Sequence, residues 1–210
     1  MSGVWLLRPL PGRTFGDAAA MSPEQRARHD RLRDARRRRA FAVSRTAVSA
    51  VVAAVRGVPF GEAVWDGPAG GRPTAAGLSL SVSHAGDVTV VAVAEAGRAV
   101  GVDVEPLRPP AETVEVLFGV EQRAAFDAAP RGDRWRAVLD AWLAAEAAFK
   151  AGVERPAAFA DSVDGAFRVA LVRDGGGPPV DVSDVAAGVG LSAERLAFPD
   201  AGPQMPAGPV

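Results

Sequence analysis

The sequence predicts an α+β fold in which small, mostly antiparallel sheets pack on long helices. Two observations carry this expectation. Apolar residues recur at helical spacing within residues 22–55 and 133–151, whereas residues 78–94 and 100–104 show the composition and alternation of β-strands. Each half of the chain holds one long helical stretch and one strand region, so two similar halves are expected, meeting near residues 96–98.

The first half is expected to begin with a strand at residues 4–7 and to continue with one long helix over about residues 22–55. Residues 57–74 are rich in Gly and Pro and are typical of a loop. Residues 78–94 contain two strand-like runs separated by Ala85-Gly86-Asp87, which predicts a β-hairpin.

The second half is expected to contain a strand near Val100, a helix near residues 120–129, a helix over 133–151 and a strand over 165–173. The rest of the chain after about residue 156 shows no clear pattern. The last residues are rich in Pro, Gly and Ala and are expected to be disordered. The predicted division is therefore 1–97, 98–198 and a tail at 199–210.

The helix expected at 133–151 carries an unusual carboxylate. An apolar stripe is expected to face the core, and it consists of Trp135, Val138, Leu139, Trp142, Ala145 and Phe149. Glu146 projects from the middle of that stripe, and burial of an unpaired charge costs several kcal/mol, so it needs a cation or a strong donor. Lys150, one turn further on, is a candidate partner. The alternative is an exposed (i, i+4) pair of little energetic weight.

A second acidic position lies on the strand near Val100. Asp103 and Glu105 alternate with valines, so both point to one side of the strand, roughly 7 Å apart. Together with Glu146 they would supply hard oxygen ligands, which favour Mg²⁺. The chain has no Cys and two His, which argues against zinc or copper. An acidic, solvent-facing strand edge explains Asp103 and Glu105 equally well.

Two further residues have the chemistry of a phosphate site. Lys150 is the single lysine among 24 basic residues, and a lysine presents a compact charge suited to a phosphate or a proton. His84 is expected where the first hairpin strand reaches its turn, a rim position at which an imidazole can meet a ligand.

Three segments in order resemble the motifs of the Sfp-type 4′-phosphopantetheinyl transferases. They are residues 81–87 (SVSHAGD), 101–105 (GVDVE) and 142–150 (WLAAEAAFK). The resemblance extends upstream to residues 71–73 and 38–45, and it covers roughly residues 20–155. It implies a pseudo-twofold pair of α/β subdomains with the active site between them.

The resemblance also implies an activity. The family transfers the phosphopantetheine arm of coenzyme A to a serine of an acyl or peptidyl carrier protein and releases adenosine 3′,5′-bisphosphate. Roles carry over by position: Asp103, Glu105 and Glu146 match the Mg²⁺ ligands, His84 and Lys150 meet the diphosphate, Ser83 also contacts coenzyme A, and Arg45, Arg38 and Arg72 bind its adenosine phosphates. The catalytic group would be Glu146, Lys150 and His84, with Glu146 or a metal-bound water accepting the serine proton.

Two departures from the family pattern leave an alternative open. Ala145 stands where the family has a Lys, and the helical spacing predicts that this position is buried. The residues after about 156 match no strand pair of the family. The alternative is a non-catalytic relative that binds coenzyme A or a carrier domain.

Composition excludes several other classes. The net charge is −1 and the arginines of residues 26–45 are not interleaved with aromatic residues, so nucleic acid is not an expected partner. No run of 18 apolar residues and no secretion signal is present, so a cytoplasmic protein without membrane association is expected. The protein is also expected to be a monomer. The basic stretch suits an acidic carrier protein. The chain has no Gly-rich phosphate loop, which argues against a phosphotransferase that acts on nucleotides.

Overall fold

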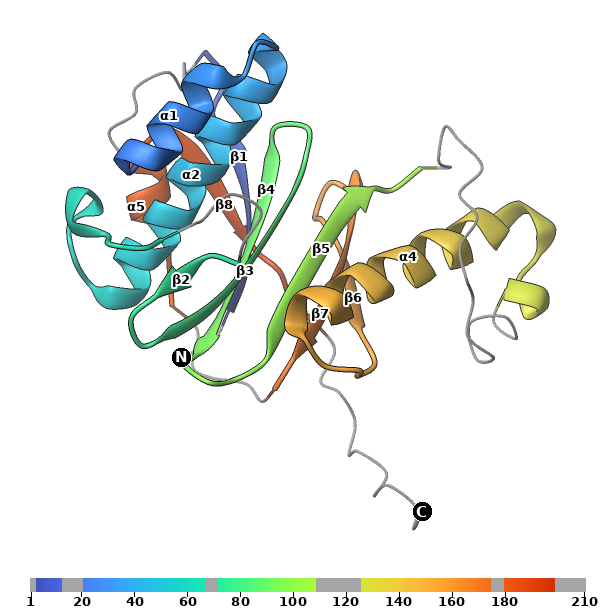
Figure 1. Ribbon diagram of the computed structural model, residues 1–210. Helices are drawn as coiled ribbons and strands as arrows, with labels where there is room; N and C mark the ends of the chain where they lie inside the picture. Colours follow the sequence, from blue (N-terminus) through green and yellow to red (C-terminus); the bar gives the residue numbers. More distant parts are fainter. Residues whose placement is uncertain (1–2, 13–20, 67–71, 109–125, 175–179, 199–210) are drawn as a thin grey trace.

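The structure, a computed structural model, describes residues 3–12, 21–66, 72–108, 126–174 and 180–198 (Figure 1). It has the predicted α+β class, with two antiparallel sheets and helices on their outer faces. The five-stranded sheet has the order β2-β3-β4-β1-β8 and the three-stranded sheet the order β5-β7-β6. The strands are β1 (Gly3–Pro9), β2 (Thr74–Ala75), β3 (Leu78–Ala85), β4 (Val88–Glu95), β5 (Val100–Pro106), β6 (Ala158–Asp161), β7 (Phe167–Arg173) and β8 (Leu191–Arg195).

The helices are α1 (Pro23–Arg31), α2 (Ala35–Arg56), α4 (Arg134–Ala151) and α5 (Ser183–Gly188), with short 3₁₀ turns η2 (Phe60–Glu62) and η3 (Arg131–Asp133). Helices α1, α2 and α5 lie on the side of the five-stranded sheet away from the three-stranded sheet, and α4 lies across the outer face of the three-stranded sheet (Figure 1). The layers therefore run helix, sheet, sheet, helix.

The alternation of side chains along each strand builds this layering. In β1, Trp5 and Leu7 belong to the core shared with α2, whereas Val4 and Leu6 belong to the core between the two sheets. Strand β4 is likewise buried on both faces, which explains why its sequence is an almost continuous apolar run. The predicted hairpin is confirmed, with β3 and β4 paired from Leu78↔Glu95 to Ala85↔Val88.

The single long helix predicted over residues 22–55 is wrong, because the structure has two helices there. Ser22 caps α1 in a capping box with Gln25, and α1 ends at Arg31 with Leu32 as its C-cap. Asp34 then caps α2 by accepting a hydrogen bond from the Arg37 backbone at 2.7 Å. A short acidic side chain that satisfies free backbone donors starts a new helix, so Asp34 marks the break that apolar periodicity alone does not reveal.

The region after residue 156 supplies elements of both sheets. The strand predicted at 165–173 is confirmed as β7, which pairs with β5 and β6. Strand β8, within the range 98–198 assigned to the second half, pairs instead with β1 of the first half. The helix predicted near residues 120–129 falls largely outside the described residues, as does the tail 199–210.

Helix α4 has the predicted extent but faces differently. Its buried stripe consists of Leu139, Leu143, Ala147 and Ala151, which pack on Ala170 and Val172 of β7. The predicted core stripe is confirmed for Leu139 and Trp135, which pack in this core, and is wrong for Trp142, Ala145 and Phe149, which are exposed. Glu146 is half-buried beside the buried stripe.

Gly101 of β5 explains the orientation of α4. A Cβ at Gly101 would overlap the Ala147 carbonyl oxygen and the Ala151 backbone nitrogen, so the absence of a side chain lets α4 lie directly on the strand. The small side chains of Ala147 and Ala151 permit the same close approach. Leu143 and its neighbours on that stripe therefore face the sheet, and the bulky Trp142 and Phe149 do not.

Candidate functional site

The centre of the candidate site is a hydrogen-bonded group of three side chains from three elements. Lys150 Nζ of α4 donates to Asp103 Oδ1 of β5 at 2.5 Å. Ser83 Oγ of β3 donates to the same Asp103 oxygen at 2.6 Å and accepts from Lys150 at 3.2 Å. Asp103 is 5% exposed and Ser83 is buried, so the carboxylate is satisfied by partners within the protein.

Each of these side chains is placed by the local fold. Asp103 shares its side of β5 with Gly101, the side that faces α4, because successive side chains alternate. The close approach of α4 at Gly101 then puts Lys150 beside the carboxylate. Ser83 comes from β3, whose outer edge pairs with β2 only at Leu78 and Ser79.

Strands β3 and β5 are joined by serine side chains. Ser81 Oγ accepts a hydrogen bond from the Val102 backbone at 3.0 Å, and Ser83, two residues further along β3, binds Asp103, the next residue of β5. This contact supplies a partner for a buried backbone donor of β5. It also holds the edges of the two sheets together at the place where the candidate residues meet.

The two other predicted acids differ in their surroundings. Glu105 is half-buried, and its pKa is raised, first by burial and then by the charge of Asp103, with Lys150 opposing the effect. Glu146 is half-buried too, and among the described residues no ion-pair or hydrogen-bond partner reaches its carboxylate. The expected Glu146–Lys150 pair is therefore wrong, because Lys150 binds Asp103 instead.

His84 lies at the exposed end of β3, as its rim position predicted. Its pKa is lowered from 6.5, first by desolvation and then by the positive charges of Arg45 and Lys150, while Asp103 raises it. Its ring is thus neutral near pH 7, and the positive charges of Arg45 and Lys150 that act on it favour an anionic ligand.

Arg45 of α2 is held between two aromatic rings. Its guanidinium carbon lies 4.7 Å from the Phe41 ring centroid and 5.2 Å from that of Trp65. Burial, followed by the charge of Arg28, lowers the pKa of Arg45 to about 10. Its Nε is buried without a hydrogen-bond partner among the described residues.

The other two predicted arginines have partners within the protein. Arg38 donates to the Leu32 carbonyl at 3.2 Å, where α1 ends, and Arg72 donates to the Val100 carbonyl at 3.4 Å. Each guanidinium retains further donors. Their assignment to the adenosine phosphates remains a prediction.

The acids do not form a closed metal cage. Within the described ranges no group of three or more His, Cys, Asp or Glu side chains is arranged to hold a metal ion. Asp103 and Glu105 nevertheless feel each other's charge, as the raised pKa of Glu105 records. Two carboxylates of this kind fit Mg²⁺, which is often held by one or two carboxylates with waters and substrate phosphates completing its shell.

Sequence reasoning missed three contributors to the site, namely Ser81, Phe41 and Trp65. Ser81 lies two residues before Ser83, so strand alternation places both side chains on one face. Its part in the site could therefore have been predicted from the sequence. Trp65 lies in a loop, donates to Ser49 Oγ at 2.8 Å and reaches Arg45 only through the tertiary fold.

No protein-family model matches the chain, and no curated protein matches it significantly. Among the described residues, no helix is long and apolar enough to cross a membrane.

Proposed function

We propose that this protein transfers the 4′-phosphopantetheine arm of coenzyme A to a serine of an acyl or peptidyl carrier protein. The observation that carries the proposal is the convergence of Ser83, Asp103 and Lys150 in one hydrogen-bonded group, beside His84. These residues come from three segments of the chain, and each segment resembles a different motif of the transferase family.

The charges around the group suit a diphosphate. The positive charges of Arg45 and Lys150 both act on His84, and an anion bound beside these residues would be stabilised by them. Lys150 also contacts Asp103, so it links the phosphate side of the site to the acidic side. Arg45, held by Phe41 and Trp65, is suited to the adenosine end of coenzyme A.

The proposed reaction is a phosphoryl transfer in one displacement. The serine oxygen of the acceptor forms a bond to the phosphorus that carries the pantetheine arm, and the bond from that phosphorus to the bridging oxygen breaks. The electron pair leaves with the 5′-phosphate of adenosine 3′,5′-bisphosphate. Cationic groups that hold the diphosphate in place supply most of the rate enhancement in such reactions.

The serine proton needs an acceptor, and we assign this role to Glu146. It lies one turn from Lys150 on α4, is half-buried, and has no competing partner among the described side chains. His84 and Lys150 would meanwhile donate to the phosphate oxygens.

A divalent cation would be held by Asp103 and Glu105, with Glu146 as a third candidate, and would neutralise the charge of the diphosphate. In its absence Lys150 neutralises Asp103. Asp103 and Glu105, through the cation, and Lys150 and His84 would thus all act on the same diphosphate.

The experiment that tests the proposal is intact-mass analysis of apo carrier domains from fatty-acid, polyketide and peptide synthetases. Each is incubated with the protein, coenzyme A and Mg²⁺. We expect one carrier to gain the mass of one phosphopantetheine, and the gain to disappear with a chelator. If a folded sample that binds coenzyme A modifies none of the carriers, the protein is a non-catalytic binder and the proposal is wrong.

A further inference from the structure

Helix α4 is apolar around most of its circumference but packs on the protein along one flank. Only five of its 18 residues are charged, and its packed stripe is Leu139, Leu143, Ala147 and Ala151. A helix that is apolar all round is normally covered on all sides. No described residue packs over the outer face of α4 at Phe149, which is 84% exposed, so within the described part of the chain this apolar face is largely uncovered.

Two aromatic side chains stand on this outer face. Trp142 is 41% exposed and Phe149 is 84% exposed, and Ala145 lies between them at helical spacing and is exposed as well. We call Trp142, Ala145 and Phe149 the outer stripe. Large aromatic residues exposed together are typical of protein interaction sites.

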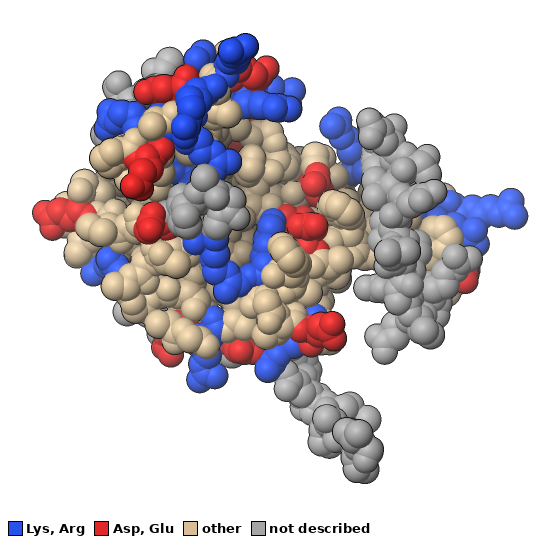
Figure 2. All heavy atoms as spheres, in the orientation of Figure 1, with Lys and Arg blue, Asp and Glu red and all other residues tan. Residues whose placement is uncertain are grey.

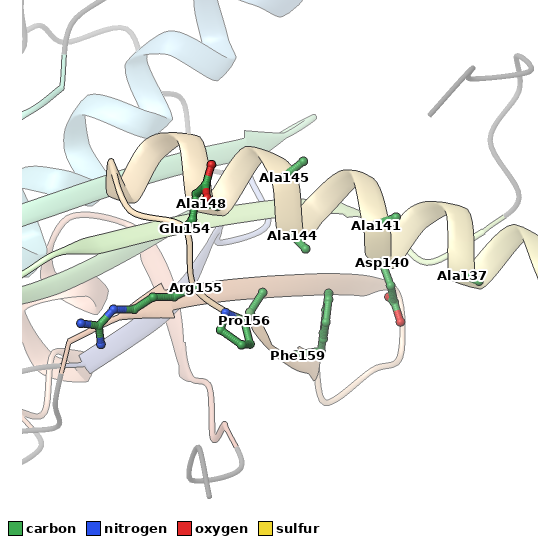
Figure 3. Close-up of a pocket in the computed structure, with 11 residues that line it drawn as sticks. Ala137, Asp140, Ala141, Ala144, Ala145, Ala148, Glu154, Arg155, Pro156 and Phe159 are labelled. Atoms are coloured by element: carbon green, nitrogen blue, oxygen red, sulfur yellow. The ribbon is translucent and has the colours of Figure 1, made fainter. Parts of the chain in front are cut away.

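The outer stripe continues into a groove on the neighbouring side of α4. The groove has a volume of about 550 Å³, with five alanines of α4 on one wall and Pro156, Ala157 and Phe159 on the other. Figure 3 shows Ala144 on the side of α4 that faces Pro156 and Phe159. Ala145 belongs both to the outer stripe and to the groove, so the two form one apolar surface.

This surface borders the proposed reaction centre. Phe149 directly precedes Lys150, which binds Asp103, and Trp142 lies one turn before Glu146. An acceptor whose serine reaches Lys150 and Glu146 must lie against the adjoining face of α4.

On the other side of the centre the surface is basic. Residues 26–45 contain nine arginines and two aspartates, and Lys and Arg side chains gather over α1 and α2 (Figure 2). Arg39 of α2 forms an ion pair with Asp87 at 3.1 Å, three residues beyond His84, so this basic region adjoins the reaction centre. A partner seated over the centre thus meets arginines on one side and aromatic side chains on the other.

We infer that the outer stripe and its groove bind the acceptor protein, through an apolar segment close to the modified serine, while acidic residues of the acceptor meet the arginines of α1 and α2. The inference rests on the proposed function. It names Trp142 and Phe149 as the anchors that determine which acceptors are bound, a role distinct from the binding of coenzyme A.

The test is the double variant Trp142→Gln/Phe149→Gln, in which glutamine keeps a good helix propensity and removes the aromatic surface. The matched control is Val163→Gln, which alters an apolar residue that is 90% exposed in the β6–β7 turn. For both variants we would measure the Kd for apo carrier domains by calorimetry, the KM values for carrier and coenzyme A, the Tm and the solution mass.

We expect the double variant to raise the Kd and KM for the carrier about tenfold or more, the size found for aromatic anchors at interfaces. The KM for coenzyme A and the Tm should stay at the wild-type values, and Val163→Gln should change none of these quantities. An unchanged carrier Kd and KM, with wild-type transfer intact, overturns the inference and leaves the proposed function standing.

Other occupants of the surface give different results. If the double variant has a Tm several degrees below wild type, the surface is covered by the chain itself. If wild type is a dimer in solution and the double variant is a monomer, a second copy of the chain covers it. If the wild type binds no carrier in calorimetry, the inference falls. If it binds carriers in a stripe-dependent way but transfers nothing, the proposed function falls and the docking surface remains.

Discussion

The ammonium nitrogen of Lys150 lies 2.5 Å from Oδ1 of Asp103, so that helix α4 is tied to strand β5 by an ion pair at the proposed reaction centre. The Asp103 side chain is 7% exposed and the Lys150 side chain 27%. Removing one partner of such a pair leaves a buried charge without compensation, which is much more costly than the pair itself is favourable.

Lys150→Met should therefore lower the free energy of unfolding by roughly 2–3 kcal/mol, less than for a fully buried pair because Lys150 is partly exposed. Added Mg²⁺ or Mn²⁺ should restore part of the loss, because a divalent cation then compensates Asp103. Urea unfolding with and without the metal measures both effects.

The double variant Asp103→Asn/Lys150→Met is the control for that experiment. It removes both charges, so it should be more stable than Lys150→Met alone and should show no metal effect. Equal stability of wild type and Lys150→Met would mean that Asp103 does not depend on the lysine.

Ser81→Ala tests the side-chain link between β3 and β5. It leaves the buried Val102 N–H without its acceptor, which should cost about 1–3 kcal/mol of stability. Hydrogen exchange of the Val102 amide should accelerate strongly. Ser79→Ala, two residues earlier on the same strand, is the matched control and should leave that amide protected.

Much of the fold follows from local patterns. The β3–β4 hairpin, strands β5 and β7, and the extent of α4 were all predicted because alternation and helical spacing are local signals. The expectation that the acidic strand and α4 meet near His84 is consistent with the Ser83–Asp103–Lys150 group.

The packed face of α4 and the partner strand of β8 were not predicted, because both depend on contacts between distant segments. The sequence of α4 is apolar nearly all round, so periodicity did not select its packed face, and the choice was made by the close approach at Gly101. The pairing of β8 with β1 joins residues near opposite ends of the chain, and no local pattern names a partner strand.

Gly101→Ala should be strongly destabilising, because the new methyl group would overlap the α4 backbone at Ala147 and Ala151. Overpacking of this kind typically costs 1–3 kcal/mol, and a clash with backbone atoms should cost at least about 3 kcal/mol. Chemical denaturation measures the loss. Gly132→Ala, where an added Cβ meets no atom within 4 Å, is the control and should stay within about 0.5 kcal/mol of wild type.

Glu146→Gln tests the proposed proton acceptor. Glu146 is half-buried and makes no side-chain contact that the described structure needs, so the Tm should be close to that of wild type. Loss of a general base should lower kcat for phosphopantetheine transfer by about 100-fold or more. Glu62→Gln, an exposed glutamate of η2, is the control. Equal kcat in wild type and Glu146→Gln would remove Glu146 from the mechanism.

The lowered pKa of His84 predicts how stability depends on pH. Desolvation, and then the charges of Arg45 and Lys150, hold the folded-state pKa below the value of about 6.5 expected in the unfolded chain. As pH falls through 6.5, the unfolded chain takes up a proton before the folded protein does, so the unfolded state is favoured. The contribution of neutral His84 to stability is thus complete above pH 6.5 and is lost progressively below it.

The Tm of wild type should therefore fall more steeply than that of His84→Gln between about pH 7.5 and 5, the range in which an unshifted histidine titrates. His29→Gln alters the other histidine and should leave the pH dependence of the Tm as in wild type. Bound coenzyme A should reverse the sign of this pH dependence, because a diphosphate beside His84 favours its protonated form. The affinity for coenzyme A should therefore increase as pH falls. Parallel Tm curves for wild type and His84→Gln would show that His84 does not feel the positive charges around it.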